Sequence, residues 1–577
     1  MNTPTEHPLF SIVVPIWHPS LSKLRNCIGS VRAQTFTNWE LIVVGDGPHP
    51  GEVLAELDWA DPRIRHAITD HQLGPIEASN HGLALAKGDF IGFLGSGDTL
   101  APFALEACQE PLHSFDDIDM IYTDEDSLDH NRNRHSPVFK PSWSPERLWA
   151  QMYIGQLALY SRSLIKDIGG LDPNFEGAHH YDLSLRAAGK VRRVAHIPRV
   201  CCHRDDTPGS PSERTSISPR TEQAGLRSVQ AHLDRLGVDA EATPFPNQPG
   251  ITHISPRRSS VAASIIIPTS GTIKFVDGDP VHLPDDAIRS ILAHRGDNDV
   301  EIVVILDSSA TADCAERIKS LDSERIVVVQ DQEPFNFSRA SNMGATVSTN
   351  DFLVFLNDDT SVLDPTWLAR LELYANLPGV GAVGAKLLYG DGRLQHVGLV
   401  GSYGQILHQH IGFPGSHTGD QMETIIPRNV LAVTGACLAI SKEIFVEVGG
   451  FPVSLPLAFN DVDLCIKLRE AQYRVVVDNQ TQLTHHESTT RCPVASEQEA
   501  AYLAGTISDI VTNDPYNNPN FTTSGPEQTP PAQAVVVGME MIGSTQFPFR
   551  VSTPYASGAP KCNELDRYYW PVAQTSA

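Results

Sequence analysis

The sequence predicts an α/β protein with two tandem domains, each built on a mostly parallel central sheet. Short apolar segments of the first half recur in the same order in the second half of the 577-residue chain. Within each half, β-branched segments of strand length alternate with segments of helical character. Such alternation is typical of βαβ crossovers, in which helices cover both faces of parallel strands.

The long-range repeat defines the two domains. Residues 11–15 (SIVVP) recur as residues 264–268 (SIIIP), and residues 40–46 (ELIVVGD) recur as residues 301–307 (EIVVILD). Further matches keep this order while their offset drifts only from 262 to 282 residues: Ala78-Ser79-Asn80 with Ala340-Ser341-Asn342, Phe93-Leu94 with Phe355-Leu356, Gly169-Gly170 with Gly449-Gly450, Asp182-Leu183 with Asp463-Leu464, and His203 with His485.

The chain divides into four predicted regions. These are a first domain (1–207), a Ser/Pro-rich linker with a short helix (208–258), a second domain (259–519) and a tail of low order rich in Pro, Thr, Ser and Gly (520–577). The linker helix is predicted for residues 222–236, because apolar residues follow helical spacing there and Gly237 comes next. An insertion at residues 269–283, rich in Gly, Pro and Asp, is predicted to be a surface loop.

Composition narrows the class of protein. Hydrophobic residues at 41% and charged residues at 19% are typical of a globular protein, and a net charge of −26 argues against nucleic acid as a partner. The apolar runs are shorter than the roughly 18 residues that a membrane span needs. The nine cysteines form no CxxC pair, so we expect free thiols. Since the start lacks the pattern of a secretory signal, we expect a cytoplasmic protein.

In the second domain, a buried strand at residues 352–356 ends in Asn357-Asp358-Asp359. Parallel sheets bind ligands at the carboxyl ends of their strands. Carboxylates suit a hard divalent cation, so we predict Asp359 as a metal ligand, with Asn357 or Asp358 reaching sugar, ribose or metal-bound water. The alternative is a β-turn with Asp as a helix cap.

Two later segments strengthen the prediction of an active site. Asp461 and Asp463 stand at the start of a helical stretch, and we predict Asp461 as the general base and Asp463 as the helix cap or a contact to the acceptor. His485 is predicted to complete the metal sphere, with His486 as the reserve. The alternative for the aspartates is a simple helix N-cap, and the alternative for the histidine is a structural role.

Donor-binding residues are predicted upstream of these motifs. Asp307 ends the second strand and is placed to accept hydrogen bonds from a base or ribose. Arg339 and Asn342 are predicted to hold phosphate or ribose, and Pro268 and Thr269 close the first strand on the same side.

These motifs resemble the inverting family 2 glycosyltransferases of the GT-A fold. The resemblance spans about residues 10–204 and 263–519, and Leu356-Asn357-Asp358-Asp359-Thr360 looks like the DxD-type metal motif of that family. Three further segments look like family motifs: Thr434-Gly435-Ala436-Cys437 like the acceptor-side strand, Gly449-Gly450-Phe451 like the turn before the base, and Asn460-Asp461 like the catalytic dipeptide. His485-His486-Glu487-Ser488 and Asp514-Pro515-Tyr516 resemble the endings of tandem members from bacterial O-antigen and surface polysaccharide synthesis, some of them rhamnosyltransferases.

The resemblance implies a two-domain GT-A transferase that needs Mg²⁺ or Mn²⁺. It would take a UDP-, dTDP- or GDP-sugar as donor and a glycan or lipid-linked glycan as acceptor, with inversion at the anomeric carbon. Peripheral association with membrane assembly machinery at the cytoplasmic face is left open. Two other functions also stay open, a non-catalytic carbohydrate-binding scaffold and a sugar nucleotidyltransferase, although the second should carry a basic Gly-rich loop that residues 268–272 match poorly.

The first domain departs from the family pattern. Its strand end reads Leu94-Gly95-Ser96-Gly97-Asp98, so Gly97 is predicted to match Asp359, and His180 is predicted to match Asp461. Glycine has no side chain to bind a metal, and we predict that this domain has lost sugar transfer. The retained counterparts are Asp46, Asp98 and His203. The competing view is a metal-independent transferase with His180 as base.

Overall fold

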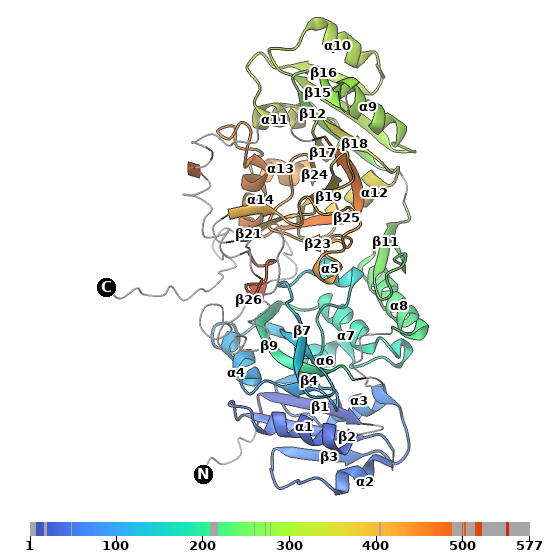
Figure 1. Cartoon of the computed structure of the whole chain (residues 1–577), viewed down its shortest axis with the longest axis vertical. Coiled ribbons are helices and arrows are strands. Elements are labelled where there is room, and N and C mark those ends of the chain that lie inside the picture. The colour runs from blue at the N-terminus through green and yellow to red at the C-terminus, as the bar shows by residue number, and fades with distance from the viewer. Residues whose placement is uncertain are drawn as a thin grey trace, which may run out of the picture.

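The computed structural model describes residues 7–16, 20–47, 49–207, 217–258, 260–271, 273–276, 279–402, 405–486, 499, 501–502, 514–521 and 550–552. Figure 1 shows an elongated molecule with one large sheet in its lower half and a second in its upper half. We call the parts of the chain that carry them the first unit and the second unit. This arrangement confirms the predicted α/β fold class.

The first unit is built on the sheet order β3-β2-β1-β4-β8-β6-β9, with β5 on β9 and β7 on β6. Its strands are β1 (Phe10–Ile16), β2 (Trp39–Gly45), β3 (Ile64–Ile68), β4 (Phe90–Phe93), β5 (Thr99–Leu100), β6 (Ile118–Leu128), β7 (Arg134–Val138), β8 (Ala158–Ser161) and β9 (Arg193–Asp205). Its helices are α1 (Leu21–Arg32), α2 (His49–Ala55), α3 (Pro75–Leu85), α4 (Ala104–Gln109), α5 (Pro145–Ala150), α6 (Arg162–Ile168) and α7 (His179–Ala188).

The second unit repeats this topology. Its strand order is β16-β15-β12-β17-β24-β19-β25-β18. These strands correspond, one by one, to β3-β2-β1-β4-β8-β6-β9-β5 of the first sheet. The strands are β12 (Ala262–Thr269), β15 (Asp299–Leu306), β16 (Ile326–Gln330), β17 (Phe352–Leu356), β18 (Thr360–Val362), β19 (Val380–Leu388), β24 (Cys437–Ser441) and β25 (Arg474–His485). The helices are α9 (Leu283–Ala293), α10 (Ala312–Lys319), α11 (Phe337–Val347), α12 (Trp367–Ala375), α13 (Lys442–Glu447) and α14 (Asn460–Glu470).

Both sheets are parallel at one end and mixed at the other. At one end of each sheet, four strands pair in parallel: β3-β2-β1-β4 in the first unit and β16-β15-β12-β17 in the second. The neighbouring strand in the sheet, β8 or β24, pairs antiparallel with the strands on both of its sides. The parallel strands are rich in Val and Ile and almost wholly buried, because helices cover both faces. The predicted strand-end positions therefore share one edge of each sheet.

Between β19 and β24 the second unit carries a segment that is longer than its counterpart between β6 and β8. It contains β20 (Leu394–His396), the hairpin of β21 (Leu399–Ser402) and β22 (Gln405–His408), and β23 (Arg428–Asn429). We call residues 389–429 the second-unit insertion.

The connection between the units is ordered over most of its length. The predicted linker helix is confirmed as α8 (Pro219–Leu236), which ends at Gly237 with φ +69°. It is followed by the hairpin of β10 (Ala240–Pro244) and β11 (Thr252–Pro256), and Figure 1 shows α8 and β11 along one side of the molecule. Residues 208–216 of the predicted linker lie outside the described residues.

Two predictions about irregular segments need correction. The insertion predicted as a surface loop at residues 269–283 contains a hairpin, β13 (Ile273–Val276) with β14 (Asp279–His282). In the predicted low-order tail, β26 (Arg550–Ser552) pairs antiparallel with β9, so this part of the tail extends the first sheet. Most of the remaining tail lies outside the described residues.

The two units pack through buried contacts. On α5, Trp149 lies 6.2 Å from the ring of Tyr374 on α12, and Glu146 accepts a 2.6 Å bond from Arg474. The segment 514–521 joins both units, because Asp514 accepts from the backbone of Gly401 in the second unit. Asn518 donates to Asp124 in the first.

Candidate active site

In the second unit, the strand-end carboxylate of Asp359 lies beside His485. Asp359 Oδ1 is 3.1 Å from Nε2 of His485, and both residues are only 5% exposed. Their contact follows from the pairing of Thr360 on β18 with His485 on β25. Asn357 Nδ2 lies 3.3 Å from the same imidazole nitrogen. The structure thus brings together a carboxylate, an amide and an imidazole at one sheet edge.

Asp358 is turned toward the end of the first strand. Its carboxylate accepts a hydrogen bond from the Thr269 hydroxyl, which in turn accepts one from the backbone N–H of Gly271 at 2.9 Å. Pro268 pairs with Ile305 inside the sheet. The predicted donor-side residues Thr269 and Asp358 therefore contact each other directly.

Asp461 stands in the first turn of α14. Its Oδ2 accepts a 2.8 Å bond from the backbone N–H of Gly435, and its Oδ1 accepts from Val462. Phe459, just before the helix, has φ +60°, a strained conformation for a bulky side chain. Such strain costs about 1–3 kcal/mol and concentrates at functional sites. The counterpart of Phe459, Ala178 at the start of α7, has φ −134°.

The role of helix cap predicted for Asp463 is wrong. The helix begins after Phe459 and has no side-chain cap, so Asp463 lies within its first turn. Its carboxylate pairs with Lys467 at 2.7 Å and accepts from the Tyr502 hydroxyl. The carboxylate of Asp463 is therefore held by the side chains of Lys467 and Tyr502.

Three predicted donor-binding residues have protein partners in this structure. Asp307 accepts from the backbone of Ser309 at 2.8 Å, and Arg339 pairs with Asp331 at 2.8 Å. Asn342 exchanges two hydrogen bonds with the backbone of Phe451, at 2.8 and 3.0 Å, and so fastens α11 to the Gly449-Gly450 turn. Asn80 does the same with Leu171 in the first unit. For Asp307, Arg339 and Asn342, contact with a nucleotide-sugar donor stays a prediction.

The residues at the sheet edge suit a divalent cation that also binds a substrate. The described residues hold no group of three or more His, Cys, Asp or Glu side chains arranged to bind a metal by themselves. Mg²⁺ commonly takes only one or two protein carboxylates and completes its sphere with phosphate and water. Asp359 and His485, 3.1 Å apart, are spaced as neighbouring ligands of one ion would be.

The alignment predicted for the first unit needs correction. Thr99 pairs with His203 as Thr360 pairs with His485, so Asp98, and not Gly97, is the counterpart of Asp359. The loop before it is one residue longer in the first unit. A Cβ on Gly97 would lie 2.5 Å from a carboxylate oxygen of Asp205, so a side chain has no room there.

The first unit fills its matching sheet edge with internal ion pairs. Lys23 Nζ lies 2.6 Å from Asp205, whose backbone N–H donates to the fully buried Asp98 at 2.8 Å. His203 is bonded to Asp126 at 2.6 Å and not to a strand-end carboxylate. Asp46 accepts from the backbones of Leu73 and Gly74. The Lys23 ammonium thus pairs with Asp205, whose backbone is bonded to Asp98, the counterpart of Asp359.

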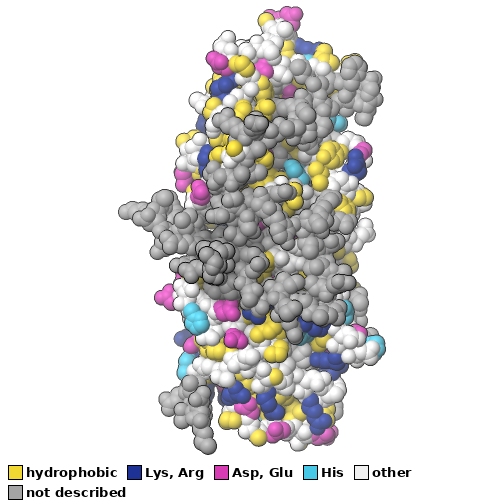
Figure 2. Space-filling view, turned by 60° about the vertical axis from the view of Figure 1, so that its left-hand side comes forward, with side chains coloured by type: hydrophobic (Ala, Val, Ile, Leu, Met, Phe, Trp, Pro, Cys, Tyr) yellow, Lys and Arg dark blue, Asp and Glu magenta, His cyan; other side chains and the backbone are white. Residues whose placement is uncertain are grey.

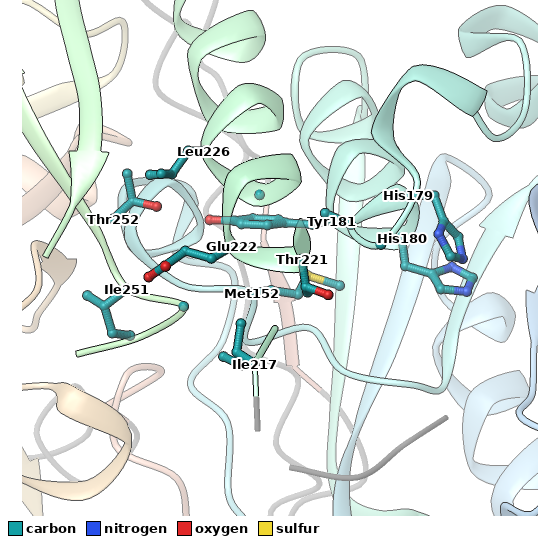
Figure 3. A pocket seen from close by; sticks show the side chains of 14 residues that line it. Met152, His179, His180, Tyr181, Ile217, Thr221, Glu222, Leu226, Ile251 and Thr252 are labelled. Atoms are coloured by element: carbon teal, nitrogen blue, oxygen red, sulfur yellow. The ribbon is translucent and has the colours of Figure 1, made fainter. Parts of the chain in front are cut away.

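The two units also differ at the position of the predicted base. His180 occupies the place of Asp461 in the second residue of its helix and lies against the ring of Phe93. Burial and the adjacent His179 lower the pKa of His180 to about 3. Figure 3 shows both histidines at one side of a cavity of about 230 Å³ between α7 and α8, with Tyr181, Met152 and Ile251 among its lining residues. An imidazole with this pKa is a weak base.

Two contacts around Asp461 were not evident from the sequence. The backbone N–H of Gly435 donates to Asp461, and His396 of the second-unit insertion accepts from the backbone N–H of Thr434, the residue before Gly435. Three histidines within residues 396–410 were a possible signal, but their spacing does not show which of them faces the site.

Surface features add little to these contacts. Figure 2 shows acidic and basic side chains interspersed over the described part of one face. Within the described ranges, no helix combines the length and the apolar character that crossing a bilayer requires.

Comparisons with known proteins agree with the geometry. The model of glycosyl transferase family 2 matches residues 11–169 and 283–448. The "Uncharacterized protein y4gI" of Sinorhizobium fredii is 35% identical, covering 84% of this chain and 54% of its own length. The "O-antigen biosynthesis protein RfbC" of Myxococcus xanthus is 33% identical, covering 90% of this chain and 40% of its own length. The chain thus spans about half or less of these relatives.

Among solved structures, S. aureus TarS 1-349 in complex with UDP-GlcNAc is similar with a TM-score of 0.33 and 16% identity, covering 39% of this chain and 66% of TarS 1-349. The family match rests on firmer ground, since its two ranges together make up more than half of the sequence and one lies in each unit. The chain therefore belongs to glycosyl transferase family 2.

Proposed function

We propose that this protein is an inverting glycosyltransferase whose second unit carries out the reaction. It transfers a sugar from a nucleoside-diphosphate sugar to a hydroxyl of a growing glycan in cell-surface polysaccharide synthesis. One observation carries the proposal: the second unit holds the Asp359–His485 pair and the Gly435-bound Asp461, and the first unit has replaced both arrangements.

The residues have distinct tasks in this reaction. Asp461 takes the proton of the acceptor hydroxyl, whose oxygen forms a bond to the anomeric carbon. The bond from that carbon to the diphosphate oxygen breaks on the opposite face, so the configuration inverts. The backbone N–H of Gly435 fixes one carboxylate oxygen of Asp461, which leaves the basic group in a set orientation.

Asp359 and His485 are the residues that would hold Mg²⁺ or Mn²⁺. The ion would neutralise the charge that develops on the departing diphosphate. Asn357 lies beside this pair, and Asp358 is fixed by Thr269 at the donor side.

The names of the relatives support a glycan acceptor. Besides the O-antigen biosynthesis protein, they include the chondroitin synthase of Escherichia coli, 28% identical over 40% of this chain. The donor is a UDP-, dTDP- or GDP-sugar in this proposal, since the family uses activated sugars. The first unit has no part in bond making and supports the second unit through their shared interface.

A donor screen with Mg²⁺ or Mn²⁺ and glycan acceptors tests the proposal. We expect wild type to consume one nucleotide sugar and Asp359→Asn to lose at least about 100-fold of that rate. The matched variant Asp98→Asn, at the structural counterpart in the first unit, should keep it. Equal loss in both variants, or equal activity of Asp359→Asn and wild type, would contradict the assignment of the second unit as the catalytic one.

A further inference from the structure

His396 lies in the second-unit insertion, fully buried at the end of β20. Its Nε2 accepts a hydrogen bond from the backbone N–H of Thr434 at 3.4 Å, and its Nδ1 lies 3.1 Å from Nδ1 of His408. These contacts join the insertion to the loop that leads into β24.

The two contacts determine where the protons are. Because Nε2 of His396 accepts from a backbone N–H, its proton must be on Nδ1, which donates to Nδ1 of His408. His408 then carries its own proton on Nε2. Burial, the neighbouring His408 and Arg428, and His485 hold the pKa of His396 well below its ordinary value, so it stays a neutral acceptor.

The loop held by His396 is the loop that holds the base. Thr434 is followed by Gly435, whose N–H donates to Asp461 at 2.8 Å. Gly435 is also confined on its other side, since a Cβ there would lie 3.2 Å from the Phe337 ring. A shift of the Thr434 peptide would therefore move the donor that orients Asp461.

The first unit differs at the position that corresponds to Gly435, just before the strand. The pairings of Gly92 with Leu159 and of Val354 with Ala439 make Gly155 the counterpart of Gly435. A Cβ on Gly155 would meet Glu125, which pairs with the fully buried Lys140 at 3.1 Å. Within the described residues, the histidine support and the carboxylate base occur together in the second unit only.

We propose that His396, with its proton fixed by His408, is a positioning residue that holds the Thr434-Gly435 loop against Asp461. This inference rests on the proposed role of Asp461 as base. The insertion that carries His396 is itself anchored to the first unit, where Gln421 donates to the backbone of Phe139 at 2.9 Å. The first unit thus contributes to the placement of the base through the insertion.

The experiment compares three variants of the full chain. His396→Leu removes the acceptor for the Thr434 N–H, and His396→Gln retains one in its side-chain carbonyl. His232→Leu removes a similarly buried histidine of α8, in the connection between the units, and controls for general destabilisation. Hydrogen exchange of peptides spanning residues 431–437 is measured by mass spectrometry, together with kcat and the donor KM.

We expect faster exchange of this segment in His396→Leu only, and a kcat lower by about 10- to 100-fold with a donor KM within about 3-fold of wild type. His396→Gln should recover most of both effects. Unchanged exchange in His396→Leu, or equal changes in His232→Leu, would overturn the inference. If wild type transfers no sugar at all, the proposed function fails, and the exchange data alone still decide whether His396 holds the loop.

Discussion

At the scale of single residues, the two units differ in the groups that face the sheet edge. The second unit has the Asp359–His485 pair and Asp461, whereas the first unit has Lys23 paired with Asp205 and a partly buried His180. The same fold therefore carries different polar groups at the matching positions of its two units.

Loss of the Asp461 carboxylate should affect the chemical step alone. Asp461→Asn removes the proton acceptor but keeps an oxygen for the Gly435 N–H, so kcat should fall by about 10²- to 10⁴-fold. Binding of UDP, GDP or dTDP, measured by calorimetry, should be unchanged. His180→Asn at the matching position should leave kcat within about 3-fold of wild type. A wild-type kcat in Asp461→Asn would remove this residue from the mechanism.

Acid should destabilise the first unit through His180. Its folded-state pKa of about 3 lies below the ordinary 6.5, so between these pH values the unfolded chain binds a proton that the folded chain does not. Stability is therefore lost as pH falls from about 6.5 toward 3.

A phenylalanine at position 180 tests this. His180→Phe should show a smaller drop in Tm between pH 7.5 and pH 5 than wild type. The control His81→Gln, at an exposed histidine, should show the same drop as wild type. Identical pH dependence of wild type and His180→Phe would show that His180 does not carry this effect.

At the scale of elements, glycines set how closely helices approach the parallel strands. A Cβ on Gly344 of α11 would lie 2.3 Å from Ile266 of β12, and one on Gly82 of α3 would lie 2.4 Å from Val13 of β1. The close approach of α11 places Phe337 beside Gly435, the residue that donates to Asp461. The packing of this helix thus bears on the site.

Gly344→Ala should destabilise the protein by about 1–3 kcal/mol, because the added methyl group has no space. Gly29→Ala in α1 is the control, since nothing lies within 4 Å of its Cβ position and a helical alanine should add up to about 1 kcal/mol of stability. Denaturant unfolding measures both. The penalty of Gly344→Ala should shrink in an Ile266→Ala background, and a purely additive double mutant would exclude the steric explanation.

At the scale of the whole molecule, the two units share a buried interface with charged groups in it. Arg474 is bound to Glu146 at 2.6 Å, with side chains 10% and 1% exposed. Removing one partner of a buried pair leaves the other charge without compensation, which costs about 3–5 kcal/mol. The interface also anchors the second-unit insertion, so its integrity bears on the site.

Arg474→Met should therefore lower the Tm and separate the thermal transitions of the two units in a calorimetric scan. The double variant Glu146→Met/Arg474→Met should recover most of the loss, because neither charge is then buried. Arg393→Met, which breaks an exposed pair with Asp391, should change stability by less than about 0.5 kcal/mol. A single unchanged transition in Arg474→Met would mean that this pair does not hold the units together.

The sequence by itself determined the duplication, the α/β class and the strand-end position of Asp359. These depend on local patterns: β-branched runs, helical spacing and the abrupt change from apolar to acidic residues at a strand end. The relation between the two halves was readable because the order of motifs survives divergence. Residues 222–236 of the helix at 219–236 were predictable for the same reason, from their spacing and the terminal glycine.

Only the tertiary structure decided which residues meet across long stretches of chain. It replaced Gly97 by Asp98 as the counterpart of Asp359, because that register is set by the pairing of β5 with β9, about 100 residues apart in sequence. It tied Asn342 to Phe451 and Asp463 to Lys467 and Tyr502, and it brought His396 behind the loop that holds Asp461. Such contacts depend on packing between distant segments, which no local pattern encodes.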